Sequence, residues 1–278
     1  MLHTIAVLCT LTFSGDVGVQ SICQQAAPVP PNGEWRRSAA QTRAVLLIHG
    51  YHLHVRDKYV PKAELRPWQK FDSPLVKELA KNADVFVFAY GQNVPLDVIV
   101  QESKLRGSIA QLRKLGYTEI VLLGHSAGGL IARHFVEDHP DAGVTKVIQV
   151  CSPNGGSPLA HSAAPKSQKP FLECLSVEGR RKCLDGRKGK CIPEKVQFVC
   201  VIAKTKATPH TDGIVPCECQ WTADLQKQCI PAVCVVGSHR EVVRDAKLAA
   251  VLAGLVREKQ DRWPAERIAK AKKEIFSK

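Results

Sequence analysis

Six short runs of mostly apolar residues recur along this chain of 278 residues, and each has the length of one β-strand. Within a run, apolar residues follow one another directly instead of alternating with polar ones. That pattern is typical of parallel strands covered by helices on both faces. We therefore expect strands over residues 44–50, 84–91, 119–126, 146–152, 196–203 and 232–238.

The segments between these runs have the apolar period of helices. The first follows a capping Asp72 or Ser73 and has a proline at an early helical position. Strands that alternate with helices predict an α/β fold with a mostly parallel central sheet, helices on both faces, and a ligand crevice at the carboxyl ends of the strands. The helices are expected over residues 73–83, 96–116, 127–139 and 241–260.

The rest of the chain divides around this pattern. Residues 1–21 form a short apolar stretch that ends in a small-residue cleavage site, which indicates a signal peptide and a secreted or periplasmic protein. A cytoplasmic location is the alternative, because this stretch has no Lys or Arg. Residues 22–42 are predicted to be a linker and residues 43–278 a single domain. Within it, residues 153–193 have no strand pattern and are expected to form an insertion over the crevice, and no segment has the length of a transmembrane helix.

The formal net charge of +13 is concentrated in two segments. Residues 166–195 contain nine Lys or Arg against four acidic residues, and residues 257–278 contain eight against four. This excess favours an anionic surface as a neighbour, although a solvated surface is the simpler interpretation. Specific binding of nucleic acid is not predicted, because aromatic residues do not interleave the basic ones.

The C-terminal residues 263–278 predict an amphipathic helix. Ile268, Ala271 and either Ile275 or Phe276 would share its apolar side. The helix would pack back on the domain, or alternatively meet a membrane.

The motif that carries chemistry is "LLGHSAGGL" at Leu122–Leu130, in which Gly124 and Gly128 flank Ser126. It follows an apolar strand and precedes a helix, the context in which Gly-x-Ser-x-Gly forms a sharp turn that exposes a nucleophile. The helix N-terminus also offers unpaired N–H groups to a developing oxyanion. A simple glycine-rich helix start is the alternative.

A serine hydroxyl needs a base, and the base needs an acid that orients it. His239 follows the last strand and Asp212 follows the strand before it, so both are expected at the same sheet edge as Ser126. His210 is a rival base, and Asp224 and Asp245 are rival acids.

With these residues the chain resembles the α/β-hydrolase superfamily, and within it the serine hydrolases of lipase and esterase type, from about Arg43 to Val256. "LLIHGY" resembles the oxyanion loop of the family, "GHSAGG" its nucleophile elbow, "DGIVP" its acid loop and "GSH" its histidine loop. "CSPNGGSPLA" resembles a loop after the sixth strand in such lipases, which implies that the insertion follows the sixth strand of the fold.

The resemblance implies a role for each matching position. Ser126 would be the nucleophile, Asp212 the acid and His239 the base, and the backbone N–H groups of Tyr51 and Ala127 would form the oxyanion hole. Residues with a positioning role would be His49, Gly50, Gly124 and Gly128. The loop reads "HGY" and not "HGGG", which within the family favours acyl esters of medium or longer chain.

Other polar groups have competing interpretations. "HLHVRD" at His52–Asp57 suggests a metal site, but a polar loop near the crevice is the expected outcome, and no metal or cofactor is predicted. His125 is expected to be structural. Four cysteines could hold zinc, and disulfides and buried thiols are the alternatives; removal of the leader with Cys9 would leave ten of the eleven cysteines. The zinc candidates are Cys217, Cys219, Cys229 and Cys234, the disulfide candidates are Cys174, Cys183, Cys191, Cys217, Cys219 and Cys229, and the expected buried thiols are Cys151, Cys200 and Cys234.

Taken together, the sequence predicts a serine hydrolase that cleaves a small-molecule or lipid ester through an acyl-enzyme. An acyltransferase or an amidase would use the same residues. A non-catalytic binding module on the same scaffold is the alternative from another class.

Overall fold

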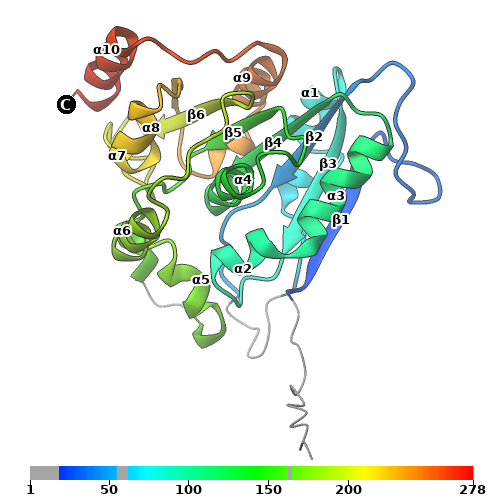
Figure 1. Cartoon of the computed structure of the whole chain (residues 1–278), viewed down its shortest axis with the longest axis horizontal. Helices are drawn as coiled ribbons and strands as arrows, with labels where there is room; N and C mark the ends of the chain where they lie inside the picture. The colour runs from blue at the N-terminus through cyan, green and yellow to red at the C-terminus, as the bar shows by residue number, and fades with distance from the viewer. Residues whose placement is uncertain (1–18, 55–61, 162–164, 278) are drawn as a thin grey trace, which may run out of the picture.

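A seven-stranded sheet runs through the protein in the order β1-β3-β2-β4-β5-β6-β7 (Figure 1). The computed structural model describes residues 19–54, 62–161 and 165–277, so most of the predicted signal peptide lies outside the described residues. The strands are β1 Ser21–Ala27, β2 Arg43–Ile48, β3 Asp84–Tyr90, β4 Glu119–His125, β5 Lys146–Val150, β6 Gln197–Lys204 and β7 Ala232–Val236. All six predicted strands are present.

In the order of the sheet, each pair of neighbouring strands from β3 through β2 to β7 is parallel. At one edge, β1 pairs antiparallel with β3. Helices cover both faces of the sheet (Figure 1), which confirms the predicted fold class. The helices are α1 Pro74–Ala80, α2 Leu96–Gln101, α3 Ser103–Lys114, α4 Ala127–Asp138, α5 Lys169–Glu173, α6 Val177–Gly186, α7 Cys217–Gln220, α8 Ala223–Lys227, α9 Ala246–Arg257 and α10 Ala265–Phe276. Short 3₁₀-helices are η1 Pro67–Gln69, η2 Pro158–His161, η3 Lys166–Gln168 and η4 Glu241–Val243.

Alternate residues of each strand enter two separate cores. Leu46 and Ile48 of β2 pack with apolar residues of α2, α3 and α4 on one face. Val45 and Leu47 pack with residues of α1 and α9 on the other face. Burial of each such side chain contributes about 1.5–3 kcal/mol, so the consecutive apolar residues that predicted the strands also hold the helices on both faces.

The linker predicted over residues 22–42 is wrong in its first part, because residues 21–27 form β1. This strand reads Ser-Ile-Cys-Gln-Gln-Ala-Ala, with Ile22 and Gln24 exposed on one side, as expected of an antiparallel edge strand with one solvated face. The side chain of Gln25 donates a hydrogen bond to the Arg36 carbonyl and accepts one from the Arg36 N–H. A polar edge strand lacks the apolar run that identified the other six.

Two predicted helices are interrupted. The helix predicted over 96–116 breaks at Glu102, which has extended backbone angles between α2 and α3. The helix predicted over 241–260 becomes η4 followed by α9, and the Asp245 side chain caps α9 by accepting from the Lys247 and Leu248 N–H groups. Asp245 therefore has a local structural role.

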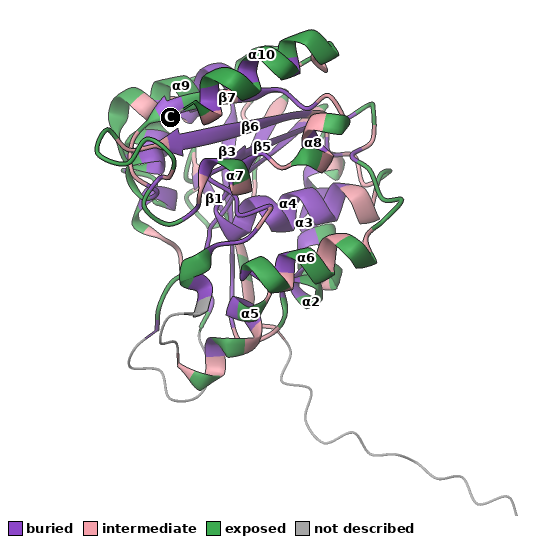
Figure 2. Ribbon diagram, turned by 90° about the vertical axis from the view of Figure 1, so that its left-hand side faces the viewer, coloured by how far each residue is buried: buried purple, intermediate pink, exposed green. Residues whose placement is uncertain are grey.

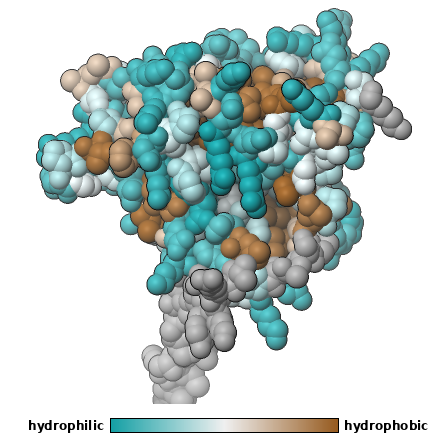
Figure 3. Space-filling view, turned by 180° about the vertical axis from the view of Figure 1, so that it is seen from behind, coloured by the Kyte–Doolittle hydropathy of each residue, from teal (hydrophilic) through white to brown (hydrophobic). Residues whose placement is uncertain are grey.

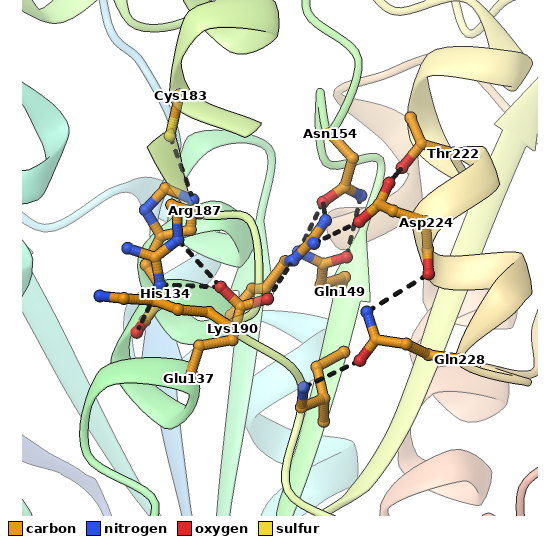
Figure 4. A network of polar contacts seen from close by, with 12 residues as sticks. His134, Glu137, Gln149, Asn154, Cys183, Arg187, Lys190, Thr222, Asp224 and Gln228 are labelled. Carbon is orange, nitrogen blue, oxygen red and sulfur yellow. Dashed lines mark hydrogen bonds and ion pairs between the residues drawn. The ribbon is translucent and has the colours of Figure 1, made fainter. Parts of the chain in front are cut away.

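The insertion at residues 153–193 follows β5, the fifth strand of this chain, and contains η2, η3, α5 and α6. The expected sixth strand is counted as in the lipases that the loop resembles, whereas β5 is the fifth strand along this chain, whose sheet has seven strands. Ion pairs of Arg187 and Lys190 with Glu137 and Asp138 of α4 hold the insertion on the domain, and Figure 4 shows Arg187 beside Glu137. Its helices α5 and α6 have mostly exposed outer surfaces (Figure 2).

The C-terminal helix α10 packs on the domain, as predicted. Ile268, Ala271 and Ile275 are buried, and Phe276 lies against Trp221 with ring centroids 6.2 Å apart. Among the described residues, no helix has both the length and the apolar character that crossing a membrane requires. The face opposite to the one in Figure 1 is mostly hydrophilic, with hydrophobic residues gathered in small separate groups (Figure 3).

The ten described cysteines are free thiols. Cys151 and Cys200 are buried as predicted, but Cys234 is exposed. The prediction for Cys234 is wrong because β7 is the last strand of the sheet and its neighbour β6 covers only one edge.

Candidate active site

Ser126 occupies the turn between β4 and α4 in a strained backbone conformation, with φ of 56° and ψ of −125°. For a residue other than glycine, such a conformation costs of order 1–3 kcal/mol and persists only where the surroundings impose it. The Ser126 N–H donates to the Val150 carbonyl over 2.7 Å, which ties the turn to β5. The serine is therefore held at the carboxyl edge of the sheet.

Two glycines make this turn possible. A Cβ atom at Gly124 would lie 2.4 Å from the Gly128 carbonyl oxygen, and one at Gly128 would lie 2.2 Å from the Ile48 carbonyl oxygen. Both obstacles are backbone atoms, so no side-chain rotation relieves them. The positions of Gly124 and Gly128 are thus fixed by the close approach of α4 to β2 and β4.

Asp212 and His239 meet at the same edge, after β6 and β7. Asp212 Oδ2 lies 2.6 Å from His239 Nδ1, and Asp212 Oδ1 accepts from the N–H groups of Ile214 and Val215 over 2.9 and 2.7 Å. Asp212 is only 1% exposed. A carboxylate only accepts, so His239 Nδ1 carries the proton and Nε2 keeps its lone pair.

The backbone holds His239 as well. The His239 N–H donates to the Asp212 carbonyl over 2.8 Å, and His125 Nε2 lies 2.7 Å from the His239 carbonyl oxygen. Burial lowers the pKa of His125 well below its ordinary value, so this ring is neutral and donates from Nε2. His125 thus has a structural contact behind His239.

Ser126 and His239 line one cavity of about 340 Å³. We call Ser126, Asp212 and His239 with this cavity the serine site. Most of its other lining is apolar, and the insertion supplies a large share of it. The insertion side chains in the wall are Pro153, Ser157, Leu159, Ala160, Leu172 and Leu175.

The loop after β2 touches the serine directly. A Cβ atom at Gly50 would lie 2.5 Å from Ser126 Cβ and 3.1 Å from Ser126 Oγ. Tyr51 follows Gly50 and lines the cavity, and Ala127 is the first residue of α4. The backbone segments of Tyr51 and Ala127 therefore both adjoin Ser126.

His49 fixes the start of this loop. Its Nδ1 lies 2.8 Å from the Gly50 carbonyl oxygen, its Nε2 accepts from the Tyr90 N–H over 3.3 Å, and its ring stacks on Tyr90 at 4.4 Å. Burial lowers the pKa of His49 to about 3, so the ring is neutral. The predicted positioning role of His49 agrees with these contacts.

Solved structures with a similar backbone share this arrangement of strands and helices. Lipase BlEst2 from Bacillus licheniformis, in its mature form, matches with a TM-score of 0.62 and 13% identity over 84% of this chain and 98% of the lipase. Phospholipase PlaB from Legionella pneumophila matches with a TM-score of 0.60 and 13% identity over 85% of this chain and 64% of the phospholipase. The chain has the α/β-hydrolase fold.

The metagenomic carboxyl esterase MGS0156 also matches, with a TM-score of 0.51 and 15% identity over 86% of this chain and 76% of the esterase. No protein-family model and no curated protein sequence matches. The structural neighbours of this α/β-hydrolase fold are thus lipases and esterases of low sequence identity.

Two glutamines and a cysteine that support the site were missed in the sequence. Gln92, after β3, donates to the Gly50 carbonyl and accepts from the His52 N–H, and Gln168 of the insertion accepts from the His54 N–H and donates to the His52 carbonyl. They fix both sides of the loop that follows β2. Gln92 could have been found, because it follows a strand at the carboxyl edge of an α/β-hydrolase fold.

Cys151 is the third residue missed. It follows β5 with a positive φ of 53°, and its thiol is hydrogen-bonded to Asp212. Burial raises the pKa of Cys151 well above its ordinary value, so the thiol stays protonated and donates to the carboxylate. Cys151 therefore helps to fix the acid of the serine site.

The rival residues lie elsewhere. His210 is exposed, Asp224 forms an ion pair with Arg133, and Asp245 caps α9. Asp57 of the suggested metal motif lies outside the described residues. Among described residues the clusters with metal-ligand spacing are His125–Cys151–His239, which overlaps the serine site, and Asp97–His134–Cys183; the four cysteines suggested for zinc are in neither.

Proposed function

We propose that this protein hydrolyses carboxylic esters, with Ser126 as nucleophile, His239 as general base and Asp212 as the acid that orients it. One observation carries the proposal: a strained Ser126 and an Asp212-bound His239 line the same mostly apolar cavity. Strain at a polar residue in a cavity is typical of functional sites. The fold's lipase and esterase neighbours agree with this chemistry.

Acylation follows from the protonation of the pair. His239 Nε2 takes the proton of Ser126 Oγ as the oxygen attacks the ester carbonyl. The carbonyl oxygen becomes an oxyanion, which the N–H groups of Tyr51 and Ala127 and the N-terminus of α4 stabilise. The imidazolium, stabilised by Asp212, then gives its proton to the leaving alkoxide, and the alcohol departs.

Deacylation repeats these steps with water. His239 Nε2 takes a proton from a water molecule, whose oxygen attacks the acyl carbon on Ser126. The second tetrahedral intermediate collapses, the proton returns to Ser126 Oγ, and the carboxylic acid is released. Asp212 stays ionised throughout and holds the imidazole.

The cavity favours an acyl chain of medium or longer length. Leu159, Leu172 and Leu175 supply apolar surface that water would otherwise have to cover, and each buried CH₂ of a substrate gains about 0.8 kcal/mol. A substrate with an acetyl group would leave most of this wall unused. We therefore propose lipid-like or other amphiphilic esters as the substrate class.

An anionic surface as a partner is proposed for the C-terminal helix more than for the insertion. In the insertion, Arg187 and Lys190 already pair with Glu137 and Asp138, and Lys195, just after it, pairs with Asp141. On α10, Lys272 and Lys273 are both exposed, and Lys273 lies opposite the buried side. Sedimentation with anionic and with zwitterionic vesicles tests this, and equal binding of Lys272→Glu/Lys273→Glu and the parent would contradict it.

The function is tested with p-nitrophenyl acetate, butyrate, octanoate and laurate. Ser126→Ala should lower kcat by a factor on the order of 10⁶, and the parent should prefer octanoate over acetate in kcat/KM. Ser157→Ala is the matched control, because Ser157 lines the same cavity and its hydroxyl donates to the Ile214 carbonyl. Equal rates for Ser126→Ala and the parent would disprove the mechanism, and a preference for acetate would disprove the substrate class.

A further inference from the structure

Two buried glutamine side chains bond to residues 50–54, which we call the oxyanion loop. Gln168 ends η3 of the insertion, and Gln92 follows β3. Gln92 Nε2 donates to the Gly50 carbonyl over 2.8 Å, and its Oε1 accepts from the His52 N–H over 2.9 Å. These two bonds hold the backbone on either side of Tyr51.

Gln168 bonds to the later part of the same loop. Its Nε2 donates to the His52 carbonyl over 2.7 Å, and its Oε1 accepts from the His54 N–H over 3.0 Å. Its Nε2 also lies 3.4 Å from Gln92 Oε1, and the Tyr51 hydroxyl donates to its Oε1 over 3.4 Å. A glutamine amide offers two donor hydrogens and two acceptor lone pairs. Gln168 therefore forms all four hydrogen bonds that its amide allows.

The backbone N–H of Tyr51 takes no part in this network. Among the described residues it has no acceptor, whereas the His52 and His54 N–H groups each donate to a glutamine. Tyr51 follows Gly50, where an added Cβ would lie 3.1 Å from Ser126 Oγ. An N–H group near the nucleophile and without a partner in the protein is available to an oxyanion. The two glutamines thus hold the loop while they leave this donor unused.

The segment that contains Gln168 also packs against Tyr51. Phe171 is buried, and its ring centroid lies 6.3 Å from that of Tyr51 and 6.0 Å from that of Tyr90. Leu172, the next residue, lines the cavity of the serine site. One short segment of the insertion therefore contacts both the oxyanion loop and the cavity.

We propose that Gln168 is a positioning residue of the serine site, through which the insertion holds the Tyr51 N–H in place to stabilise the oxyanion. This inference rests on the proposed ester hydrolysis. Gln168 is not among the described residues that line the cavity, so it acts on the transition state through the loop. Oxyanion donors are effective because they are in place before the charge develops. The insertion thereby has a catalytic role besides forming the cavity wall.

Gln168→Met removes the amide but keeps the length of the side chain. It should lower kcat for p-nitrophenyl octanoate about 30-fold, since a misplacement of about 1 Å costs a factor on the order of 10². KM should change less than about threefold, because the lost interaction is made only in the transition state. Steady-state kinetics measure both constants, and thermal melting verifies that the variant is folded. Gln168→Asn, which keeps an amide but shortens it by one CH₂, is the milder second variant and should have an intermediate kcat.

Gln25→Met is the matched control. Gln25 is buried, and its amide bonds to the carbonyl and the N–H of Arg36 in the way that Gln168 bonds to its loop. It lies on β1, which β3 and β2 separate from β4 in the sheet. This variant should lose stability much as Gln168→Met does, because buried backbone groups lose their partners in both. Its kcat should match that of the parent.

A trifluoromethyl ketone separates oxyanion stabilisation from binding of the chain. Ser126 Oγ adds to the carbonyl carbon of 1,1,1-trifluorodecan-2-one, His239 Nε2 takes the hydroxyl proton, and the carbonyl oxygen becomes an oxyanion. In Gln168→Met, the inhibition constant of this ketone should rise by about the factor by which kcat/KM falls. Decan-2-one has the same chain but forms no stable adduct, so its inhibition constant should stay unchanged.

Hydrogen exchange tests the loop without any turnover. The His54 N–H donates to Gln168, so it should exchange faster in Gln168→Met than in the parent. In Gln25→Met its exchange should match that of the parent. Mass spectrometry of a peptide that covers residues 50–54 measures this rate.

Four results bear against the account. A folded Gln168→Met with the kcat of the parent would overturn the proposal, and so would an equal loss of kcat in Gln25→Met. A changed KM and changed binding of decan-2-one at constant kcat would assign Gln168 to substrate binding. Unchanged exchange of His54 would show that the insertion does not hold the loop. Absence of Ser126-dependent hydrolysis in the parent would contradict the proposed function, and the exchange rates would still decide whether Gln168 holds the oxyanion loop.

Discussion

The serine site and the cluster of Asp97, His134 and Cys183 each combine a carboxylate, an imidazole and a hydroxyl or thiol, but the protein holds them differently. Asp212 is 1% exposed and accepts hydrogen bonds from His239 and from two backbone N–H groups. The side chain of Asp97 is 59% exposed and its bond to His134 is a single one. The first carboxylate is fixed by the sheet edge, whereas the second is fixed by one side chain.

The two nucleophiles differ in the same way. Ser126 has a strained backbone held between β4, β5 and α4, whereas Cys183 lies within the regular helix α6 and its sulfur is 3.8 Å from the imidazole. Efficient turnover needs groups held to within about 0.5 Å. We therefore propose catalytic turnover for the serine site alone.

The largest expected contrast comes from one substitution made in both sites. Asp212→Asn should lower kcat for ester hydrolysis by about 10⁴, because the amide favours the wrong tautomer of His239. Asp97→Asn should leave hydrolysis unchanged, because Asp97 does not line the cavity of the serine site. Steady-state kinetics on p-nitrophenyl octanoate measure the effect of Asp212→Asn. A loss of kcat below tenfold in the folded variant would contradict the role of Asp212 as the orienting acid.

A pair of glycines gives the next largest effect. Gly128→Ala would place Cβ 2.2 Å from a backbone oxygen of β2, and should cost about 3 kcal/mol of unfolding free energy, as tight overpacking does. Gly186 lies in α6 and lines the surface cavity beside Cys183, and an added Cβ atom there would have no atom within 4 Å. Gly186→Ala should therefore be neutral or stabilising by up to about 1 kcal/mol.

Urea unfolding monitored by circular dichroism measures both values. Gly128→Ala as stable as the parent would show that the turn around Ser126 has room to spare. Strong destabilisation by Gly186→Ala would show that α6 is packed more closely than its surroundings indicate.

The smallest expected effect concerns pH and His134. Burial lowers the pKa of His134 from about 6.5 to about 4. Between pH 4 and pH 6.5, His134 binds a proton in the unfolded chain but not in the folded protein. The contribution of His134 to the free energy of unfolding is therefore complete above pH 6.5 and is lost as the pH falls toward 4. At pH 5 the loss is about 2 kcal/mol.

His134→Gln should remove this share of the acid sensitivity. Its unfolding free energy should fall by about 2 kcal/mol less than that of the parent between pH 7.5 and pH 5. Acid sensitivity from His49, whose pKa burial lowers to about 3, would persist in both. Exposed His210→Gln is the control, and identical pH profiles for His134→Gln and the parent would contradict the buried neutral imidazole.

The serine site could be found in the sequence because each of its residues lies in the segment that comes after an apolar strand. Ser126, Asp212 and His239 come after β4, β6 and β7, whose carboxyl ends meet at one edge in a parallel sheet. The sequence does not contain such a rule for Asp97, His134 and Cys183. These residues lie inside helices from three parts of the chain, and only the packing of α2 and α6 on α4 brings them together.

The errors have similar causes. β1 was missed because Gln24 and Gln25 interrupt its apolar residues, so it has no apolar run. Cys234 was expected to be buried because the sequence does not reveal which strand ends the sheet. Gln168 comes from the insertion, more than 110 positions from the loop it holds. Long-range side-chain contacts of this kind have no local signature.

The central claim, that Ser126 is an activated nucleophile, is tested most directly by a fluorophosphonate that forms a covalent adduct with such serines. Intact mass and peptide mapping of the labelled folded protein should show one adduct, on the tryptic peptide of residues 115–133 that contains Ser126. The adduct should be absent in Ser126→Ala and should form far more slowly in His239→Ala. Absence of labelling in the parent, or equal labelling of Ser126→Ala, would contradict the account.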